Sequence, residues 1–195
     1  MSQGGALPST NSGTAAPYVV FEGQAGPDPR GSNAAQVAEG LCRIIDREGP
    51  VVAKRAYDLY LRGSDIRKMG GGLKRSLNEA LQHAIRTGRV VTEDESGNGG
   101  LVYSVVRLTG APAVVLRERG PREFAEIPPS ELQLVARRLS RDKGFELGSD
   151  VHLRAVLEFF DLKRLTVQVG TTLLDVLARR YSYVEEILRS EGGQP

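Results

Sequence analysis

The alternation of apolar and polar positions is clearest between residues 69 and 108. Residues 73–86 place apolar side chains at i, i+4, i+7, i+8, i+11 and i+12, which is the buried stripe of an α-helix. Three glycines precede this helix, and Gly88 is suited to a left-handed C-cap after it. Residues 89–92 and 101–108 are predicted strands on either side of a polar, glycine-rich turn. The pattern therefore predicts a helix followed by a β-hairpin.

Two further helices are predicted before this one. Ser32 or Asn33 caps the first, whose apolar positions are 37, 41, 44 and 45, and it ends at Glu48-Gly49-Pro50. The second spans about residues 52–62, and a polar turn follows it. Three helices and a hairpin are the parts of a winged helix–turn–helix, which we therefore expect over residues 34–110.

The second half is predicted to be helical. After residues 111–126, a linker or an extra strand, prolines suited to a first helical turn begin a three-helix unit over residues 127–190. Its second helix is capped by Ser149 or Asp150, and its last runs over 166–181, with an extension into 182–190 left open. This unit repeats the helix–turn–helix order without a hairpin. The expected fold class is mainly α with a small β-hairpin.

The first 33 residues have a different composition. They are rich in Gly, Ser, Pro, Ala and Thr, and this composition buries too little apolar surface to offset the ordering entropy. We therefore interpret residues 1–33 as a disordered tail. Its one apolar patch, residues 18–21, could dock as an edge strand or a short anchor, but we favour a loose tail.

Charge distribution is more informative than net charge. The chain has 26 Lys and Arg against 24 Asp and Glu, a net charge of +2 that favours no particular partner. Between residues 62 and 89, however, there are seven basic residues and two acidic ones. The single cysteine, Cys42, lies on a helical stripe and indicates a buried thiol in a reducing, cytoplasmic compartment. No apolar run suits a membrane span, and the first 30 residues do not have the pattern of a signal peptide.

The polar face of the third helix and its approach carries side chains that suit double-stranded DNA. Arg binds guanine edges, Asn and Gln bind adenine, and Lys and Arg hold phosphates. The candidate DNA-binding residues are Arg67, Lys68, Lys74, Arg75, Asn78, Gln82 and Arg86. The alternatives are a solvated helix face or a protein partner. The acidic hairpin tip, residues 93–95, would be repelled by phosphates, so we expect this wing to avoid DNA or to contact protein.

Catalytic and metal sites are not expected. His83 and His152 each stand alone, so no zinc site is predicted, and the sequence indicates no cofactor. Asp161-Leu162-Lys163 matches half of a nuclease motif, but its residues fall at helix ends, and such a site needs carboxylates on adjacent strands. We therefore expect a protein that is not an enzyme.

Two sets of residues suggest known families. Glu48-Gly49-Pro50-Val51 and Gly88-Arg89-Val90-Val91, placed around the second and third helices, resemble the winged-helix superfamily. Arg117-Glu118-Arg119 and residues 126–131 are similar to a poorly characterised C-terminal domain of large bacterial superfamily-one helicases linked to restriction and defence. The chain has no Gly-x-x-x-x-Gly-Lys-Ser/Thr loop, so this resemblance implies only a nucleic acid or a nucleic-acid machine as partner.

Residues 150–181 carry more apolar side chains than three short helices can cover. Phe159 and Leu174 fall beside the main stripes, so we expect them to remain outside and to form a homodimer or partner surface. Together these observations predict a non-catalytic DNA-binding protein whose second unit serves self-association or partner binding. The alternative is an adaptor that uses a winged-helix fold to bind protein and no nucleic acid.

Overall fold

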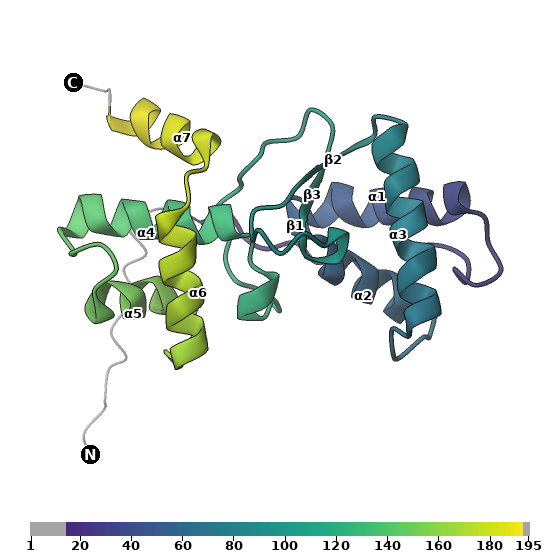
Figure 1. Ribbon diagram of the computed structural model, residues 1–195, viewed down its shortest axis with the longest axis horizontal. Helices are drawn as coiled ribbons and strands as arrows, with labels where there is room; N and C mark the ends of the chain where they lie inside the picture. Colours follow the sequence, from purple (N-terminus) through teal and green to yellow (C-terminus); the bar gives the residue numbers. More distant parts are fainter. Residues whose placement is uncertain (1–14, 193–195) are drawn as a thin grey trace, which may run out of the picture.

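The computed structural model describes residues 15–192 as a mainly helical protein with a small three-stranded antiparallel sheet (Figure 1). The helices are α1 (Ala34–Glu48), α2 (Ala53–Gly63), α3 (Gly71–Arg86), α4 (Pro129–Lys143), α5 (Asp150–Phe159), α6 (Val167–Ala178) and α7 (Ser182–Gly192). The strands are β1 (Val51–Val52), β2 (Val90–Glu93) and β3 (Val105–Leu108), and two 3-10 turns are η1 (Leu101–Tyr103) and η2 (Phe124–Glu126). None of the described helices is both long and apolar enough to cross a membrane.

Local sequence signals explain where α1 begins and where α3 ends. The Asn33 side chain accepts from the backbone N–H of Gln36, and the Gln36 side chain accepts in return from the N–H of Asn33, so Asn33 is the cap of α1. The predicted stripe of α3 is confirmed, because Leu73, Leu77, Ala80, Leu81 and Ala84 are all buried. Gly88 follows α3 with φ of +72°, the left-handed conformation that glycine adopts without strain.

The sheet contains the predicted hairpin and one strand more. β3 lies between β1 and β2, with Val51 opposite Val106 and Val91 opposite Arg107. The prediction omitted β1, because its two residues directly precede α2 and are too few to show alternation. The returning strand is also shorter than expected, since residues 101–103 form η1.

The second half contains four helices where three were predicted. The last predicted helix ends at Ala178, and a separate α7 begins at Ser182. The side-chain amide of Gln133 on α4 donates to the carbonyl oxygens of Val176, at 2.7 Å, and Arg179, at 2.8 Å. These bonds satisfy carbonyl groups at the end of α6, where helices leave them unpaired, and Arg179 is already extended.

Two separate hydrophobic cores underlie the two ends of the molecule in Figure 1. The first lies among α1, α2, α3 and the sheet, and includes Leu41, Tyr57 and Leu77. The second lies among α4, α5, α6 and α7, and includes Val135 and Phe160.

Residues 15–33 differ from the predicted disordered tail; residues 1–14 of that prediction lie outside the described part of the chain. Ala16 pairs with Arg117 in an isolated parallel bridge, and Ala25 is fully buried. The segment packs closely because Gly40 has no side chain: a Cβ there would lie 2.5 Å from the Ala25 carbonyl oxygen. Composition did not predict this, because the segment is held by contacts with distant residues: Phe21 and Ala25 pack on the first core, and the Tyr18 hydroxyl donates to Glu48.

A buried ionic network connects the two halves. Glu131 of α4 pairs with Arg122 at 2.7 Å and with Arg117 at 3.2 Å, and Arg117 donates to the carbonyl oxygens of Glu48 and Pro50. The residues around this network lie in the predicted linker, which forms no strand of the three-stranded sheet. Residues 111–126 therefore connect the two halves with Val114, Arg117 and Arg122 buried, while most of their other side chains remain exposed or half-buried.

Candidate nucleic-acid interface

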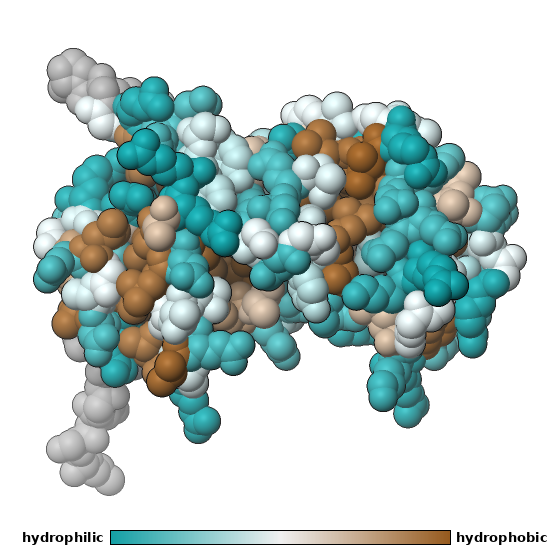
Figure 2. Space-filling model, in the orientation of Figure 1, coloured by the Kyte–Doolittle hydropathy of each residue, from teal (hydrophilic) through white to brown (hydrophobic). Residues whose placement is uncertain are grey.

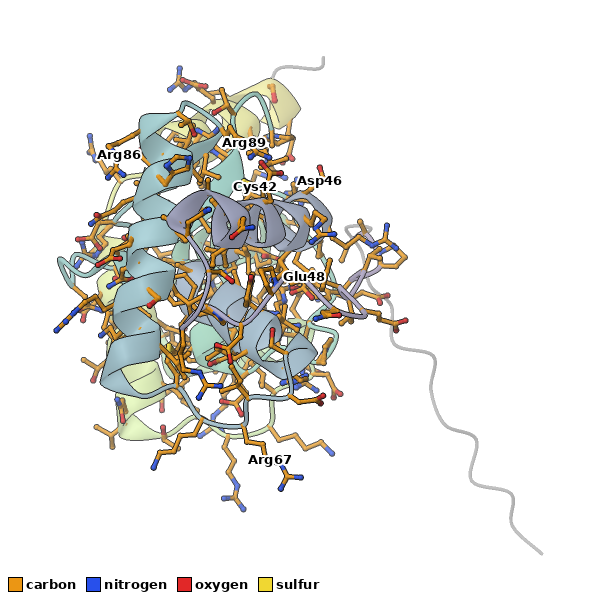
Figure 3. All side chains as sticks on the ribbon, turned by 90° about the vertical axis from the view of Figure 1, so that its right-hand side faces the viewer. Cys42, Asp46, Glu48, Arg67, Arg86 and Arg89 are labelled. Carbon is orange, nitrogen blue, oxygen red and sulfur yellow. The ribbon has the colours of Figure 1, made fainter. Side chains whose placement is uncertain are left out.

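The candidate residues lie on α3 and on the turn that leads into it. Arg67, Lys68, Lys74, Arg75, Gln82 and Arg86 are all exposed. Figure 3 places Arg86 at one end of α3 and Arg67 beyond the other. Because α3 has 16 residues, it extends about 24 Å at 1.5 Å per residue, so its two basic ends are well separated.

The candidate cations are available to a ligand. The six exposed side chains form neither a hydrogen bond nor an ion pair with any residue between 15 and 192. Neighbouring charges behave differently: Lys54 pairs with Asp58 at 2.6 Å, and Arg89 pairs with Glu39. The basic side chains of α3 and its approach therefore have no ion-pair partner among the described residues, whereas Lys54 and Arg89 do.

Asn78 is the one candidate that the structure removes from the interface. Its Oδ1 accepts a hydrogen bond of 2.9 Å from the hydroxyl of Tyr57, and its side chain is half-buried. Tyr57 is fully buried in the first core, so this bond serves a polar group that would otherwise lack a partner. Asn78 is better explained as a structural residue than as a reader of adenine, which needs both atoms of the amide.

Glu79 was missed as a member of the exposed face. It lies four residues after Arg75 and three before Gln82, so it belongs to the same row on the helix surface, and it is exposed. The sequence signal was the spacing i, i+4, i+7 and i+11 of residues 75, 79, 82 and 86, which mirrors that of the buried stripe. The basic face of α3 thus contains one acidic side chain.

The β2–β3 loop, residues 94–104, is held against the second half of the chain. The Glu95 carboxylate accepts from the backbone N–H of Ser130, at 2.8 Å in the first turn of α4, and from the Tyr183 hydroxyl, at 2.7 Å. The Tyr181 hydroxyl donates to the Glu95 carbonyl oxygen at 2.9 Å. Glu95 is 4% exposed, and this burial raises the pKa of its carboxyl.

The acidic residues at the loop tip have different partners. Asp94 accepts from the backbone N–H groups of Asn98 and Gly99, which lower the pKa of its carboxyl, the Gly99 bond most. Glu93 pairs with Arg107 at 3.2 Å. The loop is therefore held by α4 and by residues at the start of α7, and the Glu95 carboxylate is buried in that contact.

The two residues proposed for a partner surface differ in exposure. Leu174 is 47% exposed on α6. Phe159, which was expected to remain outside, is half-buried against the second core, and its ring meets Phe160 edge-on at 5.0 Å. Phe159 was misjudged because it lies at the last position of α5, where the linker residue Leu116 also approaches. Both residues line one small hollow, whose lining includes apolar and charged side chains.

Residues behind the family resemblance form the buried network. Glu48 is fully buried and accepts from Tyr18, Phe21 and Arg55. Arg117 binds the backbone of the Glu-Gly-Pro motif and the Glu131 carboxylate. The guanidinium groups of Arg55, Arg117 and Arg122 lie 5.4, 5.1 and 4.4 Å from the centre of the Tyr18 ring, within the range of cation–π contacts. These charges compensate one another, so they are unavailable to nucleic acid.

No family model matches this chain, and neither a curated protein nor a solved structure matches it. Its function is therefore inferred from its own side chains.

Proposed function

We propose that the protein is a non-catalytic, double-stranded DNA-binding protein of the winged helix–turn–helix class, in which α3 enters the major groove. The observation that carries this proposal is the set of unpaired basic side chains on the exposed face of α3 and its approach. The order helix, strand, helix, helix, strand, strand supports the class, with α2 and α3 as the helix–turn–helix and β2–β3 as the wing.

The separation of the basic residues supports binding across a groove. Arg67, Lys68 and Lys74 lie at the start of α3, and Arg86 lies at its end. The major groove is about 12 Å wide, so a helix of this length can place cations near the phosphates on both sides of it. The wing contributes little, because its tip is held by α4 and α7.

The proposal predicts a specific loss of DNA affinity. Lys74→Ala with Arg75→Ala removes two exposed charges from α3 and should weaken binding to a random-sequence duplex about 10-fold at low salt. The slope of log affinity against log salt should become shallower by roughly two, since fewer counterions are released. Fluorescence anisotropy at several salt concentrations measures both quantities.

The matched control is Lys163→Ala with Arg164→Ala, which removes an exposed Lys-Arg pair from the α5–α6 turn. We expect its affinity and salt slope to follow those of the wild type. Equal losses in the two double variants would show that binding depends on net charge alone and would exclude α3 as the contact.

The alternative function, a protein-binding adaptor, is favoured by a different feature. A hollow lies beside the α2–α3 turn, with Leu61, Ile66 and Met69 among its apolar lining and Arg62 and Glu123 among its charged lining. Charges of both signs beside these three apolar side chains suit a protein segment better than a phosphate backbone. If the wild type binds no duplex even at low salt, this adaptor becomes the better explanation.

A further inference from the structure

One row of side chains on α3 has the chemistry for reading bases. Arg75, Glu79, Gln82 and Arg86 follow one another at i, i+4, i+7 and i+11, and all four are exposed. They lie on the helix face opposite the buried residues Leu77 and Ala84. The row extends about 16 Å at 1.5 Å per residue, which is enough to cover several base edges.

The four side chains also lack partners within the described part of the chain. Across residues 15–192 they have no hydrogen-bond or ion-pair partner, although Arg75 lies four residues from Glu79. Their donor and acceptor groups are therefore open to a ligand. Asn78, which lies beside the row, differs because its amide is held by Tyr57.

Each residue in the row matches a particular base edge. Arg donates two hydrogen bonds to guanine O6 and N7, and Gln pairs with adenine N6 and N7. An ionised Glu can only accept, and the amino group of cytosine N4 is its usual donor in the major groove. Guanine and thymine present acceptors near that position and would leave the Glu carboxylate desolvated and unpaired, and adenine places its N7 acceptor beside its N6 amino group, where it repels the carboxylate.

We propose that Arg75, Glu79, Gln82 and Arg86 form a base-reading row and that Glu79 makes binding depend on a cytosine at one position of the site. This inference rests on the proposed DNA binding and adds sequence specificity to it. A carboxylate on a basic helix opposes binding to arbitrary DNA, since it meets phosphates and base acceptors. Glu79 therefore excludes wrong sites as well as selecting the right one.

The test is selection from a random duplex library with the wild type and with Glu79→Gln. The wild type should enrich a motif containing one invariant C·G pair, and replacing that pair should weaken its binding about 10-fold. Glu79→Gln should bind random duplex more tightly than the wild type and should prefer C·G at that position by less than about 2-fold, because a Gln amide can also pair with adenine there. Glu186→Gln, which removes an exposed carboxylate from α7, is the control and should keep the wild-type motif.

The outcomes separate this inference from the proposed function. Salt-dependent duplex binding without an enriched motif, or an unchanged cytosine preference in Glu79→Gln, would overturn the role of Glu79 and leave DNA binding by α3 intact. An absence of duplex binding by the folded wild type would reject both. Because Glu79 is exposed, circular dichroism should show that Glu79→Gln is folded, and Glu79→Ala provides a second variant with the same expectation.

Discussion

At the scale of single residues, a cluster of buried charged side chains connects the two halves of the chain. Glu131 is 1% exposed and its two carboxylate oxygens accept from Arg117 and Arg122, while the backbone N–H of Arg117 donates to it as well. Both guanidinium groups are themselves buried. Such a group of charges is stable only when every member has its partner, because an isolated charge in the interior carries a large desolvation penalty.

Glu131→Ala should therefore destabilise the protein strongly. The variant leaves two buried guanidinium groups without their shared carboxylate, and removal of one partner from a buried pair costs about 3–5 kcal/mol. This is a large fraction of the roughly 5–15 kcal/mol that stabilises a typical domain. Urea unfolding followed by circular dichroism measures the change.

The control for this prediction is Glu191→Ala. Glu191 pairs with Arg138 and Arg141 at the surface, where such interactions contribute about 0–1 kcal/mol. If Glu131→Ala lost no more stability than Glu191→Ala, the ionic network would not be what holds the halves together.

At the scale of elements, local signals were readable from the sequence and distant ones were not. The buried stripe of α3 depends on residues three or four positions apart, so periodicity predicts it. The caps Asn33 and Ser149 bind backbone N–H groups three positions ahead, so the residue type before each helix predicts them. The end of α6 depends on Gln133, which is 43 positions from Val176. The docking of Glu95 depends on Tyr183, 88 positions away. No local sequence pattern predicts a contact between residues so far apart in the chain.

The same distinction applies to the candidate site. The basic face of α3 was predictable because helical spacing fixes which residues share a surface. The hydrogen bond that engages the Asn78 side chain was not predictable, because its donor is the Tyr57 hydroxyl on another helix. The three acidic residues 93–95 at the hairpin tip are visible in the sequence, but only the fold distinguishes the buried Glu95 from the exposed Asp94.

The contact between the β2–β3 loop and α4 predicts a pH dependence. Burial raises the pKa of Glu95 above its ordinary value of 4.5, so the folded state binds this proton more tightly than the unfolded state. The contribution of Glu95 to stability is therefore most favourable below pH 4.5 and declines as pH rises from there through the folded pKa. The Glu95→Gln variant has no titratable carboxyl at this position, so its stability lacks this contribution.

The measurement is the free energy of unfolding of wild type and Glu95→Gln between pH 4 and pH 8. We expect the wild type to lose stability relative to the variant as pH rises through the window above 4.5, and the difference to level off beyond it. Glu186→Gln, an exposed change on α7, should follow the wild-type profile. A difference that stays constant, or that changes in the opposite direction, would show that Glu95 is not held in a buried contact.

At the scale of the whole molecule, α3 and the apolar surface of the second half lie at opposite ends (Figure 1). Figure 2 shows hydrophobic side chains gathered over α6 and a second hydrophobic strip beside α3, while the outer edge beyond α3 is mainly hydrophilic. The exposed apolar residues include Val151, Val167 and Leu174, which are 63%, 90% and 47% exposed. Gly148, just before α5, lies close to the Leu174 side chain, so the start of α5 and the face of α6 form one surface.

This arrangement supports the proposal that the second half mediates self-association. A homodimer formed through α5 and α6 would cover the apolar surface while leaving both α3 helices accessible, and paired helix–turn–helix units bind two half-sites. Phe159 is unsuited to testing this idea, because its half-buried ring packs on Phe160 and its replacement would disturb the core. Leu174 is the better position, since a polar side chain there remains in solvent in the monomer.

We therefore expect light scattering at tens of micromolar to give twice the monomer mass for the wild type and a single monomer mass for Leu174→Glu. Placing a carboxylate in an apolar interface without a partner opposes association far more than it affects the monomer. Tyr103→Glu changes a side chain of similar exposure, 49%, on η1 and should leave the dimer intact. A monomeric wild type would reject self-association; dimers in both variants would place the interface elsewhere.

If Leu174→Glu is monomeric, its affinity for an isolated half-site should equal that of the wild type, because α3 is untouched, while its affinity for a paired site should fall.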